Sequence, residues 1–141
     1  MKISQLSVFM ENRVGVLNEV TTILSNAEIN LRAFSVSDGS EFGILRVLVS
    51  DPVAALRVLQ DAGYKVTLTD VLRVNVPNEA GSLSVLLDCL AAGEVFIQYM
   101  YAFSEGDVAS IVIRPNNIDR CIEVLNASRE TLTAKSQLFS F

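Results

Sequence analysis

Apolar and polar residues alternate along the first half of the chain in a pattern that predicts six structural elements. Leu6, Val8 and Met10 alternate with less apolar residues and predict a strand over Lys2–Met10. Apolar residues then recur at three- and four-residue spacing and predict a helix over Val16–Asn26. The other predicted elements are strands at Ile29–Ser37, Phe42–Val49 and Tyr64–Thr69 and a helix from Pro52 to Ala62.

Turn and capping residues separate these elements. Asp38-Gly39-Ser40 is typical of a hairpin turn between two strands. Asp51 is a good helix cap, and Pro52 suits the first helical position. Gly63 is a typical residue to end the helix. The resulting order, strand–helix–strand–strand–helix–strand, is that of the ferredoxin-like split βαβ unit.

The second half repeats the first half at a spacing of 66 residues without an insertion. Asn12-Arg13-Val14-Gly15-Val16-Leu17 falls on Asn78-Glu79-Ala80-Gly81-Ser82-Leu83, and Leu24 falls on Leu90. The second set of predicted elements is Val71–Val76, Ser82–Ala92, Val95–Phe103, Val108–Arg114, a helix capped by Asn117 and a final strand at Ser136–Phe141.

The repeat predicts an α+β fold with two ferredoxin-like βαββαβ modules, one over residues 1–69 and one over residues 70–141. Each is expected to have an antiparallel sheet with its helices on one face. No linker separates them, because Lys65–Val76 reads almost as one β run that breaks at most around Thr69-Asp70. We therefore expect the two modules to pack together.

Composition narrows the possible functions. The 141 residues are 50% hydrophobic, which indicates a folded globular protein, and the net charge is −5. An acidic chain without a Lys/Arg stripe repels phosphate backbones, so nucleic-acid binding is not expected. No apolar run approaches the roughly 20 residues that span a bilayer, and the start lacks the apolar region of a secretory signal. The sequence thus predicts no membrane partner and a cytoplasmic location.

Histidine is absent and there are only two cysteines, Cys89 and Cys121. The commonest general base and the commonest metal ligand are therefore missing, and the cysteines lack ligand spacing. Both fall in or beside a helical apolar stripe, which favours buried thiols over a disulfide or metal pair. We expect no metal site, no cofactor and no catalytic residue.

The repeated turn between the first strand and first helix of each half is the best candidate for a binding site. Helix-start amides carry a partial positive charge that favours a carboxylate, and a glycine there lets a ligand approach the backbone. Asparagine offers both donors and an acceptor, as a zwitterionic amino acid requires. The expected ligand-binding residues are Asn12, Val14, Gly15, Val16 and Asn30 in the first half and Asn78, Ala80, Gly81 and Ser82 in the second.

Each of these residues also has a purely structural interpretation. Gly15 and Gly81 fit a turn that requires positive φ. Asn12 and Asn78 fit a turn that is capped by their own side chains. Asn30 fits the end of the preceding helix. The joint occurrence favours binding, although Phe96 stands at the position of Asn30 in the second half.

The turn carries a resemblance to a known family. A strand, Glu11-Asn12-Arg13-Val14-Gly15-Val16-Leu17, a helix and an Asn at the next strand together resemble the ACT domain. ACT domains are ferredoxin-like modules that bind amino acids or related ligands and regulate metabolic enzymes. The first half is similar to the serine-sensing ACT domain of phosphoglycerate dehydrogenases, whose two effector-holding Asn residues correspond to Asn12 and Asn30. The family's Pro before the Gly is Val14, and its His before the Glu is Met10.

The resemblance implies a regulatory protein that binds an amino acid or related small carboxylate and acts on a separate metabolic enzyme. Exposed edge strands favour a homodimer or larger assembly. Two alternatives remain open: a structural or interaction module without a ligand, and an acylphosphatase-like hydrolase that uses Arg13 with Asn12 or Asn30. The second lacks support in the other copy, where Glu79 replaces Arg13.

Overall fold

The computed structural model describes residues 2–131 and divides the chain into two compact units. The first unit is Ser4–Thr69. The second unit combines Met1–Ile3 with Asp70–Phe141, of which residues 2, 3 and 70–131 are described.

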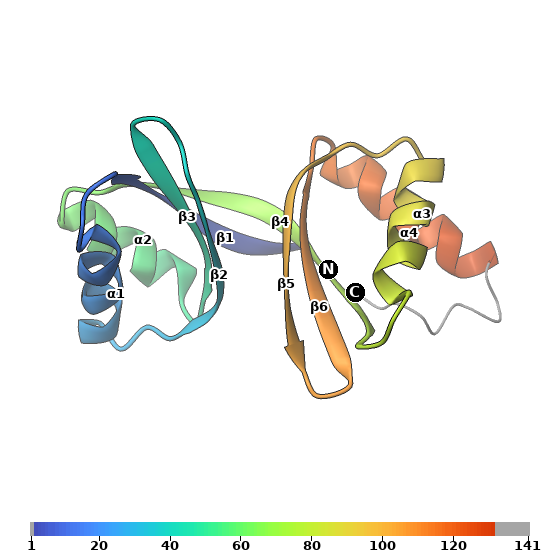
Figure 1. Cartoon of the computed structure of the whole chain (residues 1–141), viewed down its shortest axis with the longest axis horizontal. Helices are drawn as coiled ribbons and strands as arrows, with labels where there is room; N and C mark the ends of the chain where they lie inside the picture. The colour runs from blue at the N-terminus through green and yellow to red at the C-terminus, as the bar shows by residue number, and fades with distance from the viewer. Residues whose placement is uncertain (1, 132–141) are drawn as a thin grey trace. The chain divides into compact units, whose positions relative to one another are not determined.

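The first unit has the predicted order of elements. They are β1 (Lys2–Glu11), α1 (Val16–Asn26), β2 (Leu31–Ser37), β3 (Phe42–Val49), α2 (Pro52–Asp61) and the start of β4 (Lys65–Pro77). The strands lie in the order β2-β3-β1-β4, and β3 pairs antiparallel with both β1 and β2. α1 and α2 lie on one face of these strands (Figure 1).

The core of the first unit lies between that face and the helices. Leu6, Val8 and Met10 of β1 alternate toward it, and Leu45 and Val47 of β3 lie on the same face by register. Val20, Leu24, Ala55 and Leu59 of the predicted helical stripes meet them and are buried. At the start of α1 the buried residue is Val16, whereas Leu17, which its spacing from Val20 and Leu24 placed in the stripe, is 38% exposed. Burial of this apolar surface holds the two layers together.

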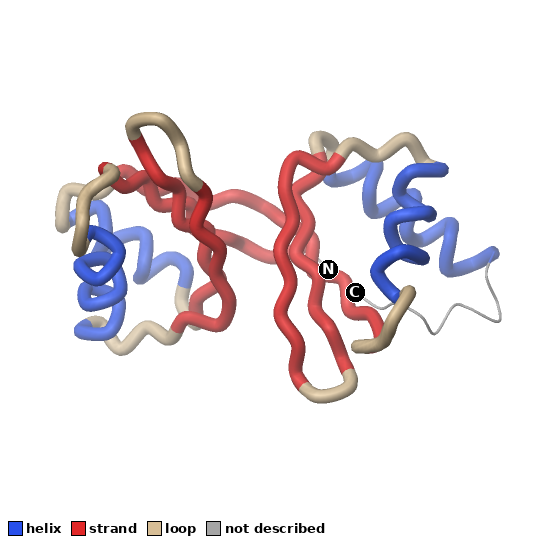
Figure 2. The backbone as a smooth tube through the Cα atoms, viewed as in Figure 1, coloured by secondary structure: helices blue, strands red, loops and turns tan. Residues whose placement is uncertain are grey.

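The second unit repeats the arrangement with different lengths. After β4 it contains α3 (Ser82–Ala92), β5 (Ile97–Glu105), β6 (Val108–Pro115) and α4 (Ile118–Thr131). Its strand order is β4-β6-β5, with antiparallel pairing and both helices on one face (Figure 2). Leu72, Val74, Leu86, Leu90 and Ile113 are buried in its core. The predicted final strand at Ser136–Phe141 lies outside the described residues.

Helix ends are set by the predicted residues. Asp51 Oδ1 accepts a hydrogen bond from the Ala54 amide at 3.1 Å, and Asn117 Oδ1 accepts one from the Arg120 amide at 3.0 Å. α2 ends because Gly63 takes a φ of 90° and its amide donates to the Gln60 carbonyl. The predictions of both caps and of this stop are confirmed.

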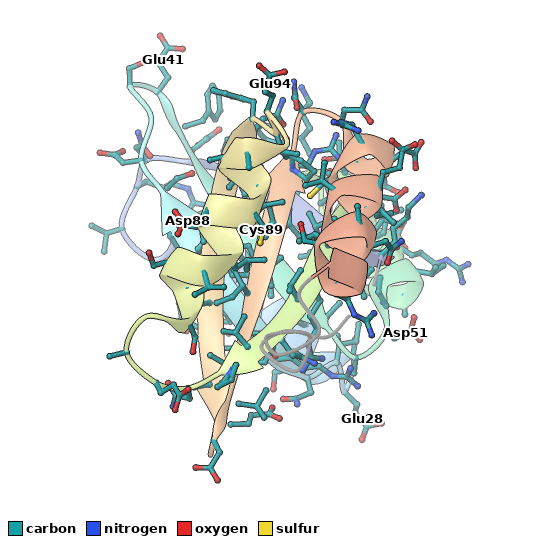
Figure 3. The ribbon with its side chains drawn as sticks, turned by 90° about the vertical axis from the view of Figure 1, so that its right-hand side faces the viewer. Glu28, Glu41, Asp51, Asp88, Cys89 and Glu94 are labelled. Atoms are coloured by element: carbon teal, nitrogen blue, oxygen red, sulfur yellow. The ribbon has the colours of Figure 1, made fainter. Side chains whose placement is uncertain are left out.

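The predicted second strand of each half began two residues too early. Glu28 and Glu94 have φ values of 58° and 54°, and the residues that follow them donate to Leu24 and Leu90 within the preceding helix. This left-handed helix end occupies Ile29 and Val95, so β2 begins at Leu31 and β5 at Ile97. Glu94 extends from the end of α3 in Figure 3.

β4 is continuous. The possible break that the sequence allowed around Thr69-Asp70 does not occur, because one strand runs over Lys65–Pro77. Since the boundary between the units falls after Thr69, this strand contributes to both units.

Among the described residues there is no disulfide, no group that could hold a metal ion and no helix that could span a membrane. Both cysteines are free thiols, with Cys121 buried and Cys89 half-buried. Within residues 2–131, no three His, Cys, Asp or Glu side chains form a group that could hold a metal ion. None of the helices in that range is long and apolar enough to span a membrane.

Candidate functional site

The β1–α1 turn of the first unit recurs almost unchanged as the β4–α3 turn of the second. Gly15 has φ 90° and ψ −9°, and Gly81 has φ 92° and ψ −17°. A Cβ at either glycine would meet nothing within 4 Å. The turn therefore requires glycine because of its left-handed backbone, and the space in front of that backbone is open.

The backbone hydrogen bonds of the two turns also correspond. Arg13 N donates to Glu11 O at 2.9 Å and Glu19 N donates to Gly15 O at 2.9 Å, while Glu79 N donates to Pro77 O at 2.9 Å. The helix caps Gly15 and Gly81 have no side chain that accepts from the helix amides. The positive end of each helix is thus left without a side-chain acceptor at its cap.

The turn asparagines do not cap their own turns. Asn12 Nδ2 donates to the carbonyl oxygen of Gly39 at 2.9 Å, and Asn78 Nδ2 donates to that of Gly106 at 3.1 Å. Each bond joins the turn to the tip of the following hairpin, 27 or 28 residues away. Because a carbonyl only accepts, the amide nitrogen must face the hairpin, and Oδ1 of each asparagine is left for another partner.

A cavity of about 310 Å³ lies at the first turn. It brings together the end of β1, the start of α1 and the β2–β3 hairpin. A Cβ at Gly43 would lie 3.5 Å from Asn12 Oδ1, so this oxygen faces a residue of the cavity wall. The lining residues are Met10, Glu11, Asn12, Arg13, Val16, Leu17, Val36, Ser37, Asp38 and Gly43.

The predicted site residues differ in exposure, and not all of them line this cavity. Asn12 and Val16 line it, whereas the side chain of Val14 is fully exposed and that of Val16 is mostly buried. In the second unit, Ala80 is exposed and Ser82 is buried. Val16 therefore anchors α1 and Ser82 anchors α3, and mainly the backbone atoms of these two residues are accessible to a ligand.

Asn30 is not beside Asn12 in the first unit. The two residues flank opposite ends of α1, whose 11 residues span about 16 Å. The backbone of Asn30 pairs with Ser50, since Asn30 N donates to Ser50 Oγ at 3.0 Å and Ser50 N donates to Asn30 O at 2.9 Å. Phe96 makes the equivalent backbone bond with Asn116 N at 3.0 Å, and its side chain is 64% exposed.

Sequence reasoning missed the contribution of the hairpin to the cavity. Val36, Ser37, Asp38 and Gly43 line it, although the sequence indicated only that a turn lies between two strands. The repeated asparagine was the signal that could have indicated the hairpin. An Asn at the same position of both copies points to one shared role, either a contact within the fold or a contact with a ligand.

The electrostatics of the two turns differ. Arg13 Nη2 lies 2.6 Å from Glu19 Oε2, and Arg13 Nε lies 3.8 Å from Glu11 Oε2. The hydrogen bond to Glu19 raises the pKa of Arg13 above its ordinary value, and the charge of Glu19 acts in the same direction. The positions of Glu11, Arg13 and Glu19 are occupied in the second unit by Pro77, Glu79 and Val85.

Solved structures share this architecture. Protein BT0572 from Bacteroides thetaiotaomicron is 44% identical, with a TM-score of 0.86 over 99% of this chain and 92% of that one. The regulatory subunits of aspartate kinase from Thermus thermophilus (ligand-free form) and Thermus flavus are 12% and 14% identical. Their TM-scores are 0.65 and 0.61, and each match covers 88% of this chain and 92% of the other. These last two likenesses show the fold alone.

A comparison with curated proteins gives no match. The sequence pattern of the ACT domain pair matches residues 1–140, which is nearly the whole chain. The resemblance inferred from the turn motif is thereby confirmed at the level of a tandem ACT protein, and the family points to a ligand-binding regulatory role. The chain belongs to the ACT domain pair family.

Proposed function

We propose that this protein binds an amino acid or related small carboxylate at the first turn and thereby regulates a separate metabolic enzyme. The cavity of about 310 Å³ at that turn is the observation that carries the proposal. Its volume lies at the lower end of the range for small-molecule sites, which suits a small ligand. Serine, which the resemblance of the first half implies, is the first amino acid to test.

The chemistry of the cavity suits a zwitterion. The start of α1 presents backbone amides and a partial positive charge to a carboxylate. Asn12 Oδ1 and the carboxylate of Asp38 are acceptors for an ammonium group. The hairpin hydrogen bond fixes Asn12 before a ligand arrives, which reduces the entropy that binding must overcome.

We further propose that the protein forms a homodimer or a larger assembly. β2 is the outermost strand of the first unit, and Phe34 and Val36 on it are 60% and 50% exposed. An unpaired strand edge with exposed apolar side chains favours pairing with a second chain. Asn30 directly precedes this strand. In an assembly that pairs along β2, the Asn30 side chain at the first-turn site would therefore come from the second chain.

Thermal unfolding in the presence of each of the twenty amino acids tests the proposal. A ligand at one hundred times its Kd adds about 2.7 kcal/mol to the free energy of unfolding. For a chain of this size that raises the melting temperature by several degrees. If none of the amino acids or simple carboxylic acids shifts the melting temperature, the sensing proposal is wrong.

The variants Asn12→Ala and Asn78→Ala form a matched pair. Each removes a hydrogen bond to an exposed hairpin and should lower the free energy of unfolding by about 0.5–1.5 kcal/mol, measured by urea unfolding. Only Asn12→Ala should also weaken the ligand-induced rise in melting temperature. Equal loss of the ligand response in both variants would mean that both turns bind.

A structural module without a ligand is the second candidate. The observation that favours it is the hairpin bond itself, because Asn12 and Asn78 already have a fold contact in both units. On that view the Asn12→Ala variant loses stability but changes no ligand response, since there is none to change.

An acylphosphatase-like activity is less well supported. Such chemistry needs a cation that is available to a phosphate, whereas the Arg13 guanidinium lies 2.6 Å from Glu19 Oε2. We therefore propose that the protein is not an enzyme of this kind. Hydrolysis of an acyl phosphate by the purified chain, lost in Arg13→Gln, would overturn this view.

A further inference from the structure

The outward face of α3 differs from that of α1, although the two helices occupy the same place in their units. Both are 11 residues long and begin at a left-handed glycine. They also turn equivalent positions toward the core, where Val20 and Leu24 of α1 and Leu86 and Leu90 of α3 are buried. The remaining positions of each helix are not held by the core, so they are free to reflect what covers the helix from outside.

On α1 these outward positions are polar, whereas most of the equivalent positions on α3 are apolar. Four positions differ in this way, and they are Glu19, Thr21, Ser25 and Asn26 of α1 and, in the same order, Val85, Leu87, Ala91 and Ala92 of α3. Ala91 and Ala92 are exposed, and Val85 and Leu87 are only half-buried. α3 thus lacks most of the polar face that a helix on one side of a sheet normally turns toward water.

Helix propensity does not explain this difference. Alanine is the best helix former, so Ala91 and Ala92 alone would suit a solvated helix. Val85 is a poorer helix former than the glutamate at the equivalent position of α1, because its branched side chain loses rotamer freedom. Val85 and Leu87 gain the full benefit of burial only when a partner covers them. The outward face of α3 therefore has the character of a contact surface.

The charge around this face has one sign. From Pro77 to Phe96, which includes α3 and both flanking turns, the charged residues are Glu79, Asp88 and Glu94, with no lysine or arginine. Asp88 lies on α3 itself, and Glu94 extends from its end (Figure 3). α4 packs against α3 and adds no excess of positive charge, since it carries three acidic and two basic residues. Such an acidic rim favours a partner with basic side chains beside its apolar contact.

We propose that the outward face of α3 is a docking surface for an amphipathic helix of the regulated enzyme, with lysine or arginine beside an apolar ridge. Leu83, Leu87 and Ala91 recur every four residues and form a row along which such a ridge packs. Leu83 is 40% exposed and lies at one end of the row. The basic side chains of the partner pair with Asp88 and Glu94. The proposal rests on the proposed function only for the identity of the partner.

A second copy of this chain fits this face less well. Asp88 lies near the middle of α3. If α3 packed against α3 of another copy about a twofold axis, this carboxylate would lie near its own equivalent. Like charges that meet across an interface oppose association, whereas a basic partner pairs with the same carboxylates. The charge of the surface therefore favours a different protein over self-association.

Amide NMR spectra of the full chain, titrated with a model peptide, test the surface. The probe is a peptide of about 18 residues with leucine and lysine at helical spacing, long enough to form a helix. It should shift the amides of Ser84 and Ala91 on α3, while the equivalent amides of Asn18 and Ser25 on α1 should not shift. A control peptide with glutamate in place of every lysine should bind at least about tenfold more weakly.

Two variants test the apolar row and the charge separately. The double variant Leu87→Thr/Ala91→Ser gives α3 the residues of α1 and should weaken binding of the lysine peptide about tenfold. Asp88→Lys should weaken the lysine peptide to a similar degree and strengthen the glutamate peptide. Thr22→Lys, at the equivalent position of α1, is the matched control and should change neither affinity. Thermal unfolding of each variant verifies that it is folded.

Four results would overturn the proposal. The lysine peptide could leave the α3 amides unshifted up to about 1 mM, or shift the amides of α1 and α3 equally. Equal affinity of the two peptides would contradict the basic partner. Shifts on α3 that depend on protein concentration without any peptide would assign the face to a second copy. No amino acid is added in these titrations, so a negative result here leaves the sensing proposal standing, and a negative thermal screen leaves this surface standing.

Discussion

The two units share a backbone but differ in what surrounds it. In both, a left-handed glycine begins the first helix and an asparagine joins the turn to the next hairpin. The first unit has Glu11, Arg13 and Glu19 around its turn, whereas the second has an uncharged residue in two of those three positions. The second helix also differs in length, since α2 ends at Asp61 and α4 continues to Thr131. A duplicated fold thus preserves the contacts that the turn needs, while charges and helix lengths are free to diverge.

Core substitutions should have the largest effects and should be equal in the two units. Leu24 and Leu90 occupy equivalent positions and are almost fully buried. Leu24→Ala and Leu90→Ala should each lower the free energy of unfolding by about 2–5 kcal/mol, measured with urea, because each leaves a cavity. A much smaller cost in one unit would show that its core relaxes around the cavity, and the equivalence of the cores would fail.

Alkaline pH should destabilise the second unit alone through Cys121. Burial raises the pKa of this thiol from 9.0 to about 11, and the equivalent buried residue in the first unit is Ala55. Between those pH values the unfolded chain has lost the proton that the folded chain keeps, so stability falls as pH rises, by on the order of 1–3 kcal/mol.

The Cys121→Ala variant gives the second unit the residue of the first and provides the control. Its free energy of unfolding should fall less steeply than that of the parent chain between pH 9 and 11. Parallel pH profiles for the two proteins, in urea unfolding at matched ionic strength, would rule out this role of the thiol.

The turn glycines should respond alike. Gly15→Ala and Gly81→Ala each place a side chain on a left-handed backbone and should cost about 1–2 kcal/mol of unfolding free energy. Because a Cβ at either position meets no neighbour, this cost is conformational and not steric crowding. Thermal unfolding of both variants measures it, and a clearly larger loss at one glycine would reveal a contact specific to that turn.

The smallest expected effects are gains in stability at Glu28 and Glu94. Both residues adopt positive φ at a helix end where Gly63 fills the same role after α2. Glu28→Gly and Glu94→Gly should each add about 0.5–1 kcal/mol, measured by urea unfolding, since glycine adopts this backbone without strain. If Glu28→Gly stabilises the protein but Glu94→Gly does not, the two helix ends are not equivalent.

Much of the fold was predictable because local signals agree with it. The bounds of α1 and α3 match those predicted, since an apolar stripe and a glycine turn act together at each. The starts of β2 and β5 were not predicted correctly, because a glutamate with left-handed backbone is not the residue that usually marks a helix end. The continuous β4 was predicted only in part, as two strands that almost join.

The candidate site was predictable in its turn but not in its surroundings. Gly15 has the positive φ that its sequence context suggested. The partner of Asn12 lies 27 residues away, at Gly39, and that contact depends on how the hairpin folds back onto the turn. The end of α2 was predicted from Gly63, but a second cavity beside it depends on how the ends of α1, α2 and β4 come together, which no local pattern encodes.

The compact units of the structure are not quite the units that were duplicated. The 66-residue repeat assigns the first residues of the chain to the first copy, yet Lys2 and Ile3 belong to the second unit, and β4 is common to both. A fragment cut at the sequence boundary would divide β4 and separate the second unit from Lys2 and Ile3. Substitutions at Lys2 or Ile3 should therefore affect the second unit, although both residues precede the first turn in the sequence.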